Sequence, residues 1–130
     1  MIVRSHFILY VTDQEASRKF YESVLAQAPK LHVPGMTEFV IGESVIVGLM
    51  PECGILRLLS LSILQIPDLN QVRGELYLVV DHPEAYHERA LLAGARVLSP
   101  MSPRDWGDSV AYSLDPNGYV LAFAQPSGAN

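Results

Sequence analysis

Much of the fold can be inferred from 106-WGDSVAYSLDPNGYVLAF-123. Two short apolar runs flank Asp115-Pro116-Asn117-Gly118, where proline presets φ and Asn-Gly supplies the positive φ angles of a tight reversal. The stretch therefore predicts a β-hairpin. A similar pattern lies earlier, where 37-TEFVI-41 and 45-VIVGL-49 flank a turn at residues 42–44. Two such hairpins in one chain indicate an internal duplication.

The opening of the chain also repeats at a fixed interval. Residues 6–11 alternate as a strand, and residues 75–80 alternate in the same way. A helix-start signal, in which a capping residue is followed three positions later by a glutamate, occurs at Thr12 with Glu15 and at Asp81 with Glu84. The second strand and the second signal both follow the first by 69 residues. A register shared by strand and helix start supports the duplication.

Between these landmarks the remaining elements can be placed. Apolar residues at helical spacing predict a first helix over residues 13–26, and the first of them are Ala16, Phe20 and Tyr21. A second helix ends at Gly94, where a left-handed residue is wanted. Further strands are expected at 30–33 and 95–98, and a proline-rich loop is expected at 99–107.

These elements predict an α+β fold made of two β-α-β-β-β modules in one domain, residues 1–130. We place the modules at 1–54 and 75–126, with a connection at 55–74. Residues 55–64 are apolar without a decisive period, so helix, strand and packed segment all stay open there. Matching the final strands pairs Gly48 with Ala122 at an offset of 74, so the second module is longer by five residues, which we assign to the proline-rich loop.

Composition narrows the class of protein. The formal net charge is -5 with no run of either sign, which argues against nucleic acid and against an anionic membrane surface. Cys53 is the only cysteine, so the chain has neither an internal disulfide nor a cysteine-based metal cluster. Arg4 and His6 interrupt the first apolar run, which is too short for a signal peptide or a membrane span. A cytoplasmic protein is expected.

Strand alternation divides the side chains of each predicted sheet between two faces. The helix-facing side is expected to carry Phe7, Leu9, Leu76, Leu78, Leu121 and Phe123. The opposite side carries His6, Ile8, Tyr10, Ile46, Gly48, Met50, Glu75, Tyr77, Val79, Val120, Ala122 and Ala124. Two strongly curved sheets forming a half-barrel, with the helices outside, would enclose a largely apolar cleft between the modules. Such a cleft is the usual form of a small-molecule site.

The duplicated module, the opening 6-HFILYVTD-13 and the ending 106-WGD-108 with 115-DPNGY-119 together resemble the vicinal oxygen chelate superfamily. That superfamily includes glyoxalase I, bleomycin-resistance proteins and extradiol dioxygenases. The resemblance implies metal ligands on the first and last strands of each module. By position these fall on His6, Gly48, Glu75 and Ala122.

Gly48 and Ala122 have no side-chain donor, so the resemblance leaves His6 and Glu75 as the metal ligands if a metal site exists. A catalytic divalent metal normally needs at least three protein ligands. A third ligand would have to come from elsewhere, such as Glu38, Glu52 or a partner subunit. We therefore predict no certain cofactor. A divalent ion (Zn, Ni, Mn or Fe) is expected only if the protein is a metal-dependent enzyme.

The candidate site residues each have a structural alternative. We expect the ligand to contact His6, Tyr10, Gly48, Met50, Tyr77, Arg104, Trp106 and Ala122. Glu75 is the candidate catalytic acid or base, because a carboxylate on an apolar strand must be exposed, paired or functional. The tyrosines can instead line the core, Trp106 can pack its loop, and His6 can bond a backbone carbonyl. His32, His82 and His87 are expected in solvent.

The favoured function is a small-molecule-binding protein, akin to bleomycin-resistance proteins, that holds an apolar or aromatic ligand in the cleft. The alternative is a metal-dependent lyase or isomerase of glyoxalase type, with lactoylglutathione lyase as the model. A third reading is an interaction module whose cleft its own side chains fill. Exposed apolar edges at residues 45–49 and 55–64 predict a homodimer. No residue pattern names the ligand.

Overall fold

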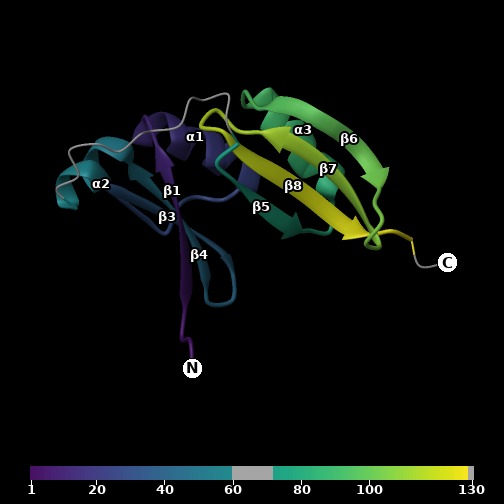
Figure 1. The fold of residues 1–130 in the computed structure, drawn as a ribbon, viewed down its shortest axis with the longest axis horizontal. Helices are drawn as coiled ribbons and strands as arrows, with labels where there is room; N and C mark the ends of the chain where they lie inside the picture. Colours follow the sequence, from purple (N-terminus) through teal and green to yellow (C-terminus); the bar gives the residue numbers. More distant parts are fainter. Residues whose placement is uncertain (60–71, 129–130) are drawn as a thin grey trace. The chain divides into compact units, whose positions relative to one another are not determined.

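The computed structural model describes residues 1–59 and 72–128 of the chain. The chain divides into two compact units, Met1–Ile66 and Pro67–Asn130. This division falls inside the predicted connection 55–74. Each unit contains one open sheet of four strands, with α1 and α2 in the first unit and α3 in the second. Figure 1 shows the sheet of each unit with its helical part.

The first unit contains β1 (Ser5–Val11), α1 (Gln14–Leu25), β2 (Leu31–Val33), β3 (Met36–Gly42), β4 (Val45–Pro51) and α2 (Glu52–Leu58). Its strands lie in the order β1-β4-β3-β2, and β1 and β4 are parallel. Helix α2 covers the start of the apolar stretch that the sequence left open, and residues 60–64 of that stretch lie outside the described residues.

The second unit contains β5 (Gly74–Val79), α3 (Pro83–Leu92), β6 (Arg96–Pro103), β7 (Asp108–Leu114) and β8 (Tyr119–Pro126). Its order, β5-β8-β7-β6, repeats that of the first unit, and β5 and β8 are parallel. Helix α3 lies along one face of this sheet (Figure 1). Within residues 1–59 and 72–128, no helix is long and apolar enough to cross a membrane.

Strand register confirms the internal duplication. His6 pairs with Ile46 in the first sheet, and Glu75 pairs with Val120 in the second. Glu75 follows His6 by the predicted 69 residues, and Val120 follows Ile46 by the predicted 74. The two pairs are therefore equivalent, and both the α+β class and the pair of β-α-β-β-β modules are confirmed.

The predicted helix caps were wrong by one residue. Asp13, not Thr12, caps α1, and its Oδ1 accepts a hydrogen bond from the Ala16 N–H at 2.9 Å. His82, not Asp81, precedes α3, and Pro83 opens that helix, where its missing N–H costs no hydrogen bond. Both starts shift by the same amount, so the 69-residue interval survives.

The predicted loop at 99–107 was also wrong. Strand β6 continues through Pro103, with register shifts against β7 between Val97 and Ser99 and between Ser99 and Ser102. Only the turn 104–107 separates the two strands. The extra length of the second module therefore extends a bulged hairpin, since bulges let proline and unpaired residues stay within a strand.

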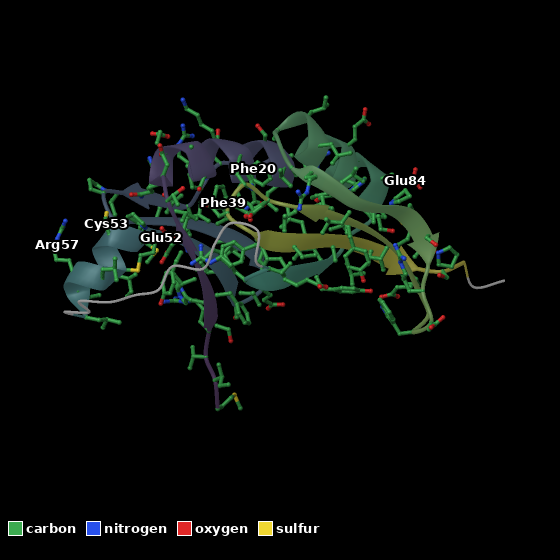
Figure 2. All side chains as sticks on the ribbon, turned by 45° about the horizontal axis from the view of Figure 1, so that its top comes forward. Phe20, Phe39, Glu52, Cys53, Arg57 and Glu84 are labelled. Atoms are coloured by element: carbon green, nitrogen blue, oxygen red, sulfur yellow. The ribbon has the colours of Figure 1, made fainter. Side chains whose placement is uncertain are left out.

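The cores are built from the helix-facing sides of the sheets, with two exceptions to expectation. Phe20 of α1 and Phe39 of β3 are buried between helix and sheet in the first unit (Figure 2). Phe7, expected there, is 55% exposed, and Ala16 also faces solvent. Strand β4, which contains the supposed apolar edge at residues 45–49, instead lies between β1 and β3. That stretch is therefore sheet interior.

Candidate functional site

Strand β5 exposes one face of the second unit. Glu75, Tyr77 and Val79 alternate along it and are all exposed, Tyr77 by 36% and Val79 by 61%. Their neighbours on β8 are buried and small or apolar. Strand β5 is the first in the sheet order, so one of its sides has no strand partner in this sheet.

The Tyr77 hydroxyl holds the tip of the β6–β7 hairpin. It donates to Asp108 Oδ2 at 2.5 Å and accepts from the Trp106 indole Nε1–H at 2.8 Å. Partial burial and the Asp108 carboxylate raise the pKa of Tyr77, so the phenol stays protonated and keeps its donor at neutral pH. The predicted residues Tyr77 and Trp106 are thus in direct contact.

Trp106 is 60% exposed even though its N–H is bonded. Its ring therefore offers surface to solvent while one hydrogen bond orients it. We call Glu75, Tyr77, Val79 and Trp106 together the aromatic strip. It contains an anionic end, two hydrogen-bonded aromatic rings and one exposed aliphatic side chain.

Arg104, predicted as a ligand contact, is bound within its own hairpin. Its Nη2 donates to Ser99 Oγ at 2.7 Å, to the Val110 carbonyl at 2.9 Å and to the Pro100 carbonyl at 3.3 Å. Its guanidinium carbon lies 5.0 Å from the centre of the Tyr112 ring. These contacts brace the bulged strand β6 against β7, which is a structural role.

Tyr112 connects Arg104 to Glu75. Burial and the negative charge of Glu75 raise the pKa of Tyr112, and the Arg104 charge acts in the opposite direction. Register places Ala122 of β8 directly between Tyr77 and Tyr112. Glu75, Tyr77 and Ala122, which were predicted as site residues, therefore share one face of this sheet with Tyr112, which was not.

Ala122 is not exposed to a ligand in this unit. Ala122, Ala124 and Val110 are fully buried and form one apolar cluster, and Tyr112 packs against it. The small residues on β8 make room for tyrosine rings from the neighbouring strands. In this unit the surface available to a ligand is the outer side of those rings.

Sequence reasoning missed Asp108 and Tyr112. Asp108 was quoted within Trp106-Gly107-Asp108 but received no role. The available signal was its place at the start of β7, on the same alternating face as Val110 and Tyr112.

In the first unit, His6 meets Glu38. Arg4 Nε donates to His6 Nε2 at 2.8 Å, and His6 Nδ1 lies 3.6 Å from Glu38 Oε2. With Nε2 accepting, the neutral ring carries its proton on Nδ1, facing the carboxylate. Register explains the proximity, because Glu38 pairs with Gly48, and Gly48 is two residues from the partner of His6.

The space above Gly48 is already filled. A Cβ at this position would lie 2.6 Å from Ile8 Cδ1 and 3.1 Å from Met36 Sδ. The side chains of Ile8 and Met36 therefore occupy the space that a larger residue at position 48 would need. Tyr10 and Met50, the other predicted contacts of this face, pair with each other across β1 and β4 and are half-buried.

The donors of the described residues do not suit a catalytic metal. Gly48 and Ala122 occupy two of the four implied ligand positions without a donor atom. His6 already uses Nε2 on Arg4 and faces one carboxylate. Within each of the two units, no three His, Cys, Asp or Glu side chains of the described residues lie close enough to hold an ion. We therefore assign no reaction step to a metal.

A hollow of about 330 Å³ lies at the start of α1, away from the predicted site residues. Gln14 lines this hollow, and its side-chain amide is already hydrogen-bonded: it donates to the Val33 carbonyl and to Thr37 Oγ1 and accepts from the Gly35 N–H. His32, expected in solvent, bonds Thr37 Oγ1 through Nδ1 at 2.7 Å. These bonds fasten the β2–β3 turn to α1, so the hollow reflects local structure.

Comparisons with known proteins identify the fold. No protein-family model matches the sequence, and no curated protein matches it. A glyoxalase-related enzyme from Fulvimarina pelagi is similar in structure, with a TM-score of 0.78 and 20% identity over 96% of this chain and 91% of that one.

Two further solved structures agree with this result. A glyoxalase/bleomycin resistance protein/dioxygenase family enzyme from Burkholderia phytofirmans PsJN gives a TM-score of 0.78 and 21% identity over 95% of this chain and 98% of that one. A glyoxalase/bleomycin resistance protein/dioxygenase from Nocardioides gives 0.77 and 20% over 100% and 86%. The chain has the fold of these proteins, as its resemblance to the vicinal oxygen chelate superfamily predicted.

Proposed function

Because the chain shares the fold of glyoxalase and bleomycin-resistance proteins, we propose that it is a small-molecule-binding protein for an apolar or aromatic ligand. The observation that carries the proposal is the aromatic strip. Tyr77 and Trp106 are exposed by 36% and 60%, yet hydrogen bonds hold both rings in place. Rings fixed before binding lose little conformational entropy when a ligand stacks on them.

Trp106 provides the assay, because it is the only tryptophan in the chain. Its fluorescence and its single indole N–H resonance report directly on the aromatic strip. We expect small aromatic probes such as benzyl alcohol to change both signals saturably. Tyr77→Phe removes the acceptor that orients the indole, so it should weaken probe binding by roughly threefold or more, since one hydrogen bond contributes about 1 kcal/mol.

Tyr86→Phe is the matched control. Tyr86 lies on α3 and packs its ring against Phe123 on the opposite side of the sheet. The same loss of one hydroxyl should leave probe binding unchanged there. If no aromatic probe perturbs Trp106 saturably, or if both variants weaken binding equally, the proposed binding surface is wrong.

A metal-dependent lyase or isomerase of glyoxalase type is the second candidate. One observation favours it: Glu38 lies 3.6 Å from His6 and so adds a carboxylate beside an implied ligand position. Elemental analysis of protein purified without chelator tests it. Stoichiometric zinc, nickel, manganese or iron, lost together with turnover in His6→Ala, would replace the binding proposal by this one.

We also expect the protein to act as a homodimer in the cytoplasm. Exposed apolar side chains on edge strands support the dimer, and the single cysteine is compatible with a reducing compartment. The cleft between the modules, and the roles expected there for His6, Tyr10, Gly48 and Met50, stay predictions.

A further inference from the structure

We propose that the ligand is an organic cation, an amine or quaternary ammonium group joined to an apolar or aromatic body. Its charge would lie against Glu75, and its body would lie on Tyr77, Val79 and Trp106. This inference rests on the proposed function and names the chemical class of its ligand.

In the second unit, arginine side chains lie over most of the tyrosine rings. Guanidinium carbons lie over three tyrosine rings: Arg73 over Tyr119 at 5.1 Å, Arg89 over Tyr86 at 4.4 Å and Arg104 over Tyr112 at 5.0 Å. Residues 72–128 contain one further tyrosine, Tyr77. It carries no arginine in the described structure, and its ring is partly open. An external cation can occupy the position that arginine takes on the other three rings.

The charges that remain accessible near the strip are negative. Glu75 is exposed at one end, and Asp105 is exposed next to Trp106. Between residues 72 and 128 there are seven acidic side chains and four arginines, three of which are stacked on rings. The fourth, Arg96, lies on β6, at the opposite edge of the sheet from β5. Arg73, two residues before Glu75, is stacked on the Tyr119 ring, and acidic groups outnumber arginines in this part of the chain, so its net charge disfavours an anionic ligand.

The two ends of the strip suit two parts of one molecule. Glu75 gives a carboxylate, while Val79 and the exposed ring of Trp106 give apolar area further along the same face. A small inorganic cation would use only the carboxylate, and a neutral aromatic compound only the rings. An organic cation uses both, because its charge and its apolar body sit on one compact skeleton.

Three probes of similar size separate these cases: benzyltrimethylammonium, benzyl alcohol and phenylacetate. Binding is followed by Trp106 fluorescence and by the indole N–H resonance. We expect the ammonium probe to bind about fivefold or more tightly than benzyl alcohol, since a partly desolvated cation adds both an ion pair and a ring contact. Phenylacetate should bind more weakly than either, and added salt should reduce the difference.

Glu75→Gln should remove the preference for the ammonium probe while leaving benzyl alcohol affinity within about twofold, because only the charge is lost. Glu88→Gln, an exposed carboxylate on α3, is the matched control and should keep the preference. Equal binding of the three probes, or tighter binding of phenylacetate, would overturn the cation assignment and leave the binding function standing. A preference that survives Glu75→Gln would also overturn it. If no probe binds at Trp106, the proposed function itself fails.

Discussion

Asp115 uses one carboxylate oxygen to hold the last turn of the chain. Its Oδ1 accepts from the backbone N–H groups of Asn117 and Tyr119, both at 2.8 Å, and the residue is 3% exposed. This arrangement explains why the Asp-Pro-Asn-Gly pattern was so informative. The aspartate supplies the hydrogen bonds, and Gly118 supplies a φ of 90°.

We therefore expect Asp115→Ala to lower the free energy of unfolding by roughly 2–4 kcal/mol, because two buried N–H donors lose their acceptor. Asp115→Asn keeps an oxygen at the same position and should lose less. Urea denaturation measures both. Equal stability of Asp115→Ala and wild type would show that these bonds do not hold the turn.

His87 on α3 was expected in solvent, and this expectation was wrong. Its Nδ1 is buried and has no hydrogen-bond partner among the described residues. Burial lowers the pKa of His87 below its ordinary value of 6.5. The folded state therefore binds this proton less readily than the unfolded state does. Stability should fall as pH drops through about 6.5, and the loss should level off below the folded pKa.

His87→Leu should remove this part of the pH dependence. We expect the free energy of unfolding to decline less between about pH 7.5 and about pH 5.5 in the variant than in wild type. The other three histidines are the same in both proteins, so the difference in slope belongs to His87. Parallel slopes would contradict the burial argument.

The two long helices end differently. Helix α1 is capped at its C-terminal end by Ala26, a non-glycine residue in the left-handed region with φ 54° and ψ 41°. Helix α3 is followed by Gly94 with φ 114°. A left-handed conformation costs an alanine more than a glycine, because the Cβ approaches the carbonyl oxygen.

Ala26→Gly should therefore raise the free energy of unfolding by about 0.5–1 kcal/mol, after allowing for the greater freedom of glycine in the unfolded chain. Gly94→Ala should lower it by about 1 kcal/mol or more. Thermal or urea denaturation should show an increase in the free energy of unfolding for Ala26→Gly and a decrease for Gly94→Ala. A loss of stability in Ala26→Gly would show that unfolded-state entropy dominates.

For individual helices, strands and turns, sequence reasoning succeeded where one local signal controls one element. The β7–β8 turn, the β3–β4 hairpin and the glycine after α3 all follow from such signals. It failed at β6, where prolines indicate a loop. Bulges, the Arg104 hydrogen bonds and pairing with β7 override that preference. It also placed both helix caps one residue early, because Thr12 and Asp13 are both acceptable caps by type.

The candidate site was predictable only in part, for a related reason. Alternation placed Glu75 and Tyr77 on one face, and the resemblance drew attention to Ala122. Whether a small residue leaves space depends on its neighbours: Tyr112 packs against the cluster that contains Ala122, and Ile8 fills the space above Gly48. The use of Arg104 within its hairpin and the bond from Tyr77 to Asp108 join residues far apart in sequence, which spacing alone does not show.

For the whole molecule we expect a homodimer. Apolar side chains on edge strands remain exposed, among them Phe7 on β1 at 55%, Val33 on β2 at 44% and Val97 on β6 at 51%. Removing such area from water favours association. Sedimentation equilibrium at micromolar concentration should give twice the chain mass of 14.3 kDa. A single species at the monomer mass would contradict this expectation.

Strand β8 is an interior strand of its sheet and the last of that sheet's four strands in the sequence. It is bonded to β5 on one side and β7 on the other. During synthesis, the first unit has all its strands once residue 51 has been made, whereas the second stays without a central strand until residues 119–126 emerge. The first unit can therefore complete its sheet early in synthesis, whereas the second cannot complete its sheet until β8 has been made. Until β8 has been made, β5 has no strand partner on either side in this sheet, and both of its edges are open to chaperones or neighbouring nascent chains.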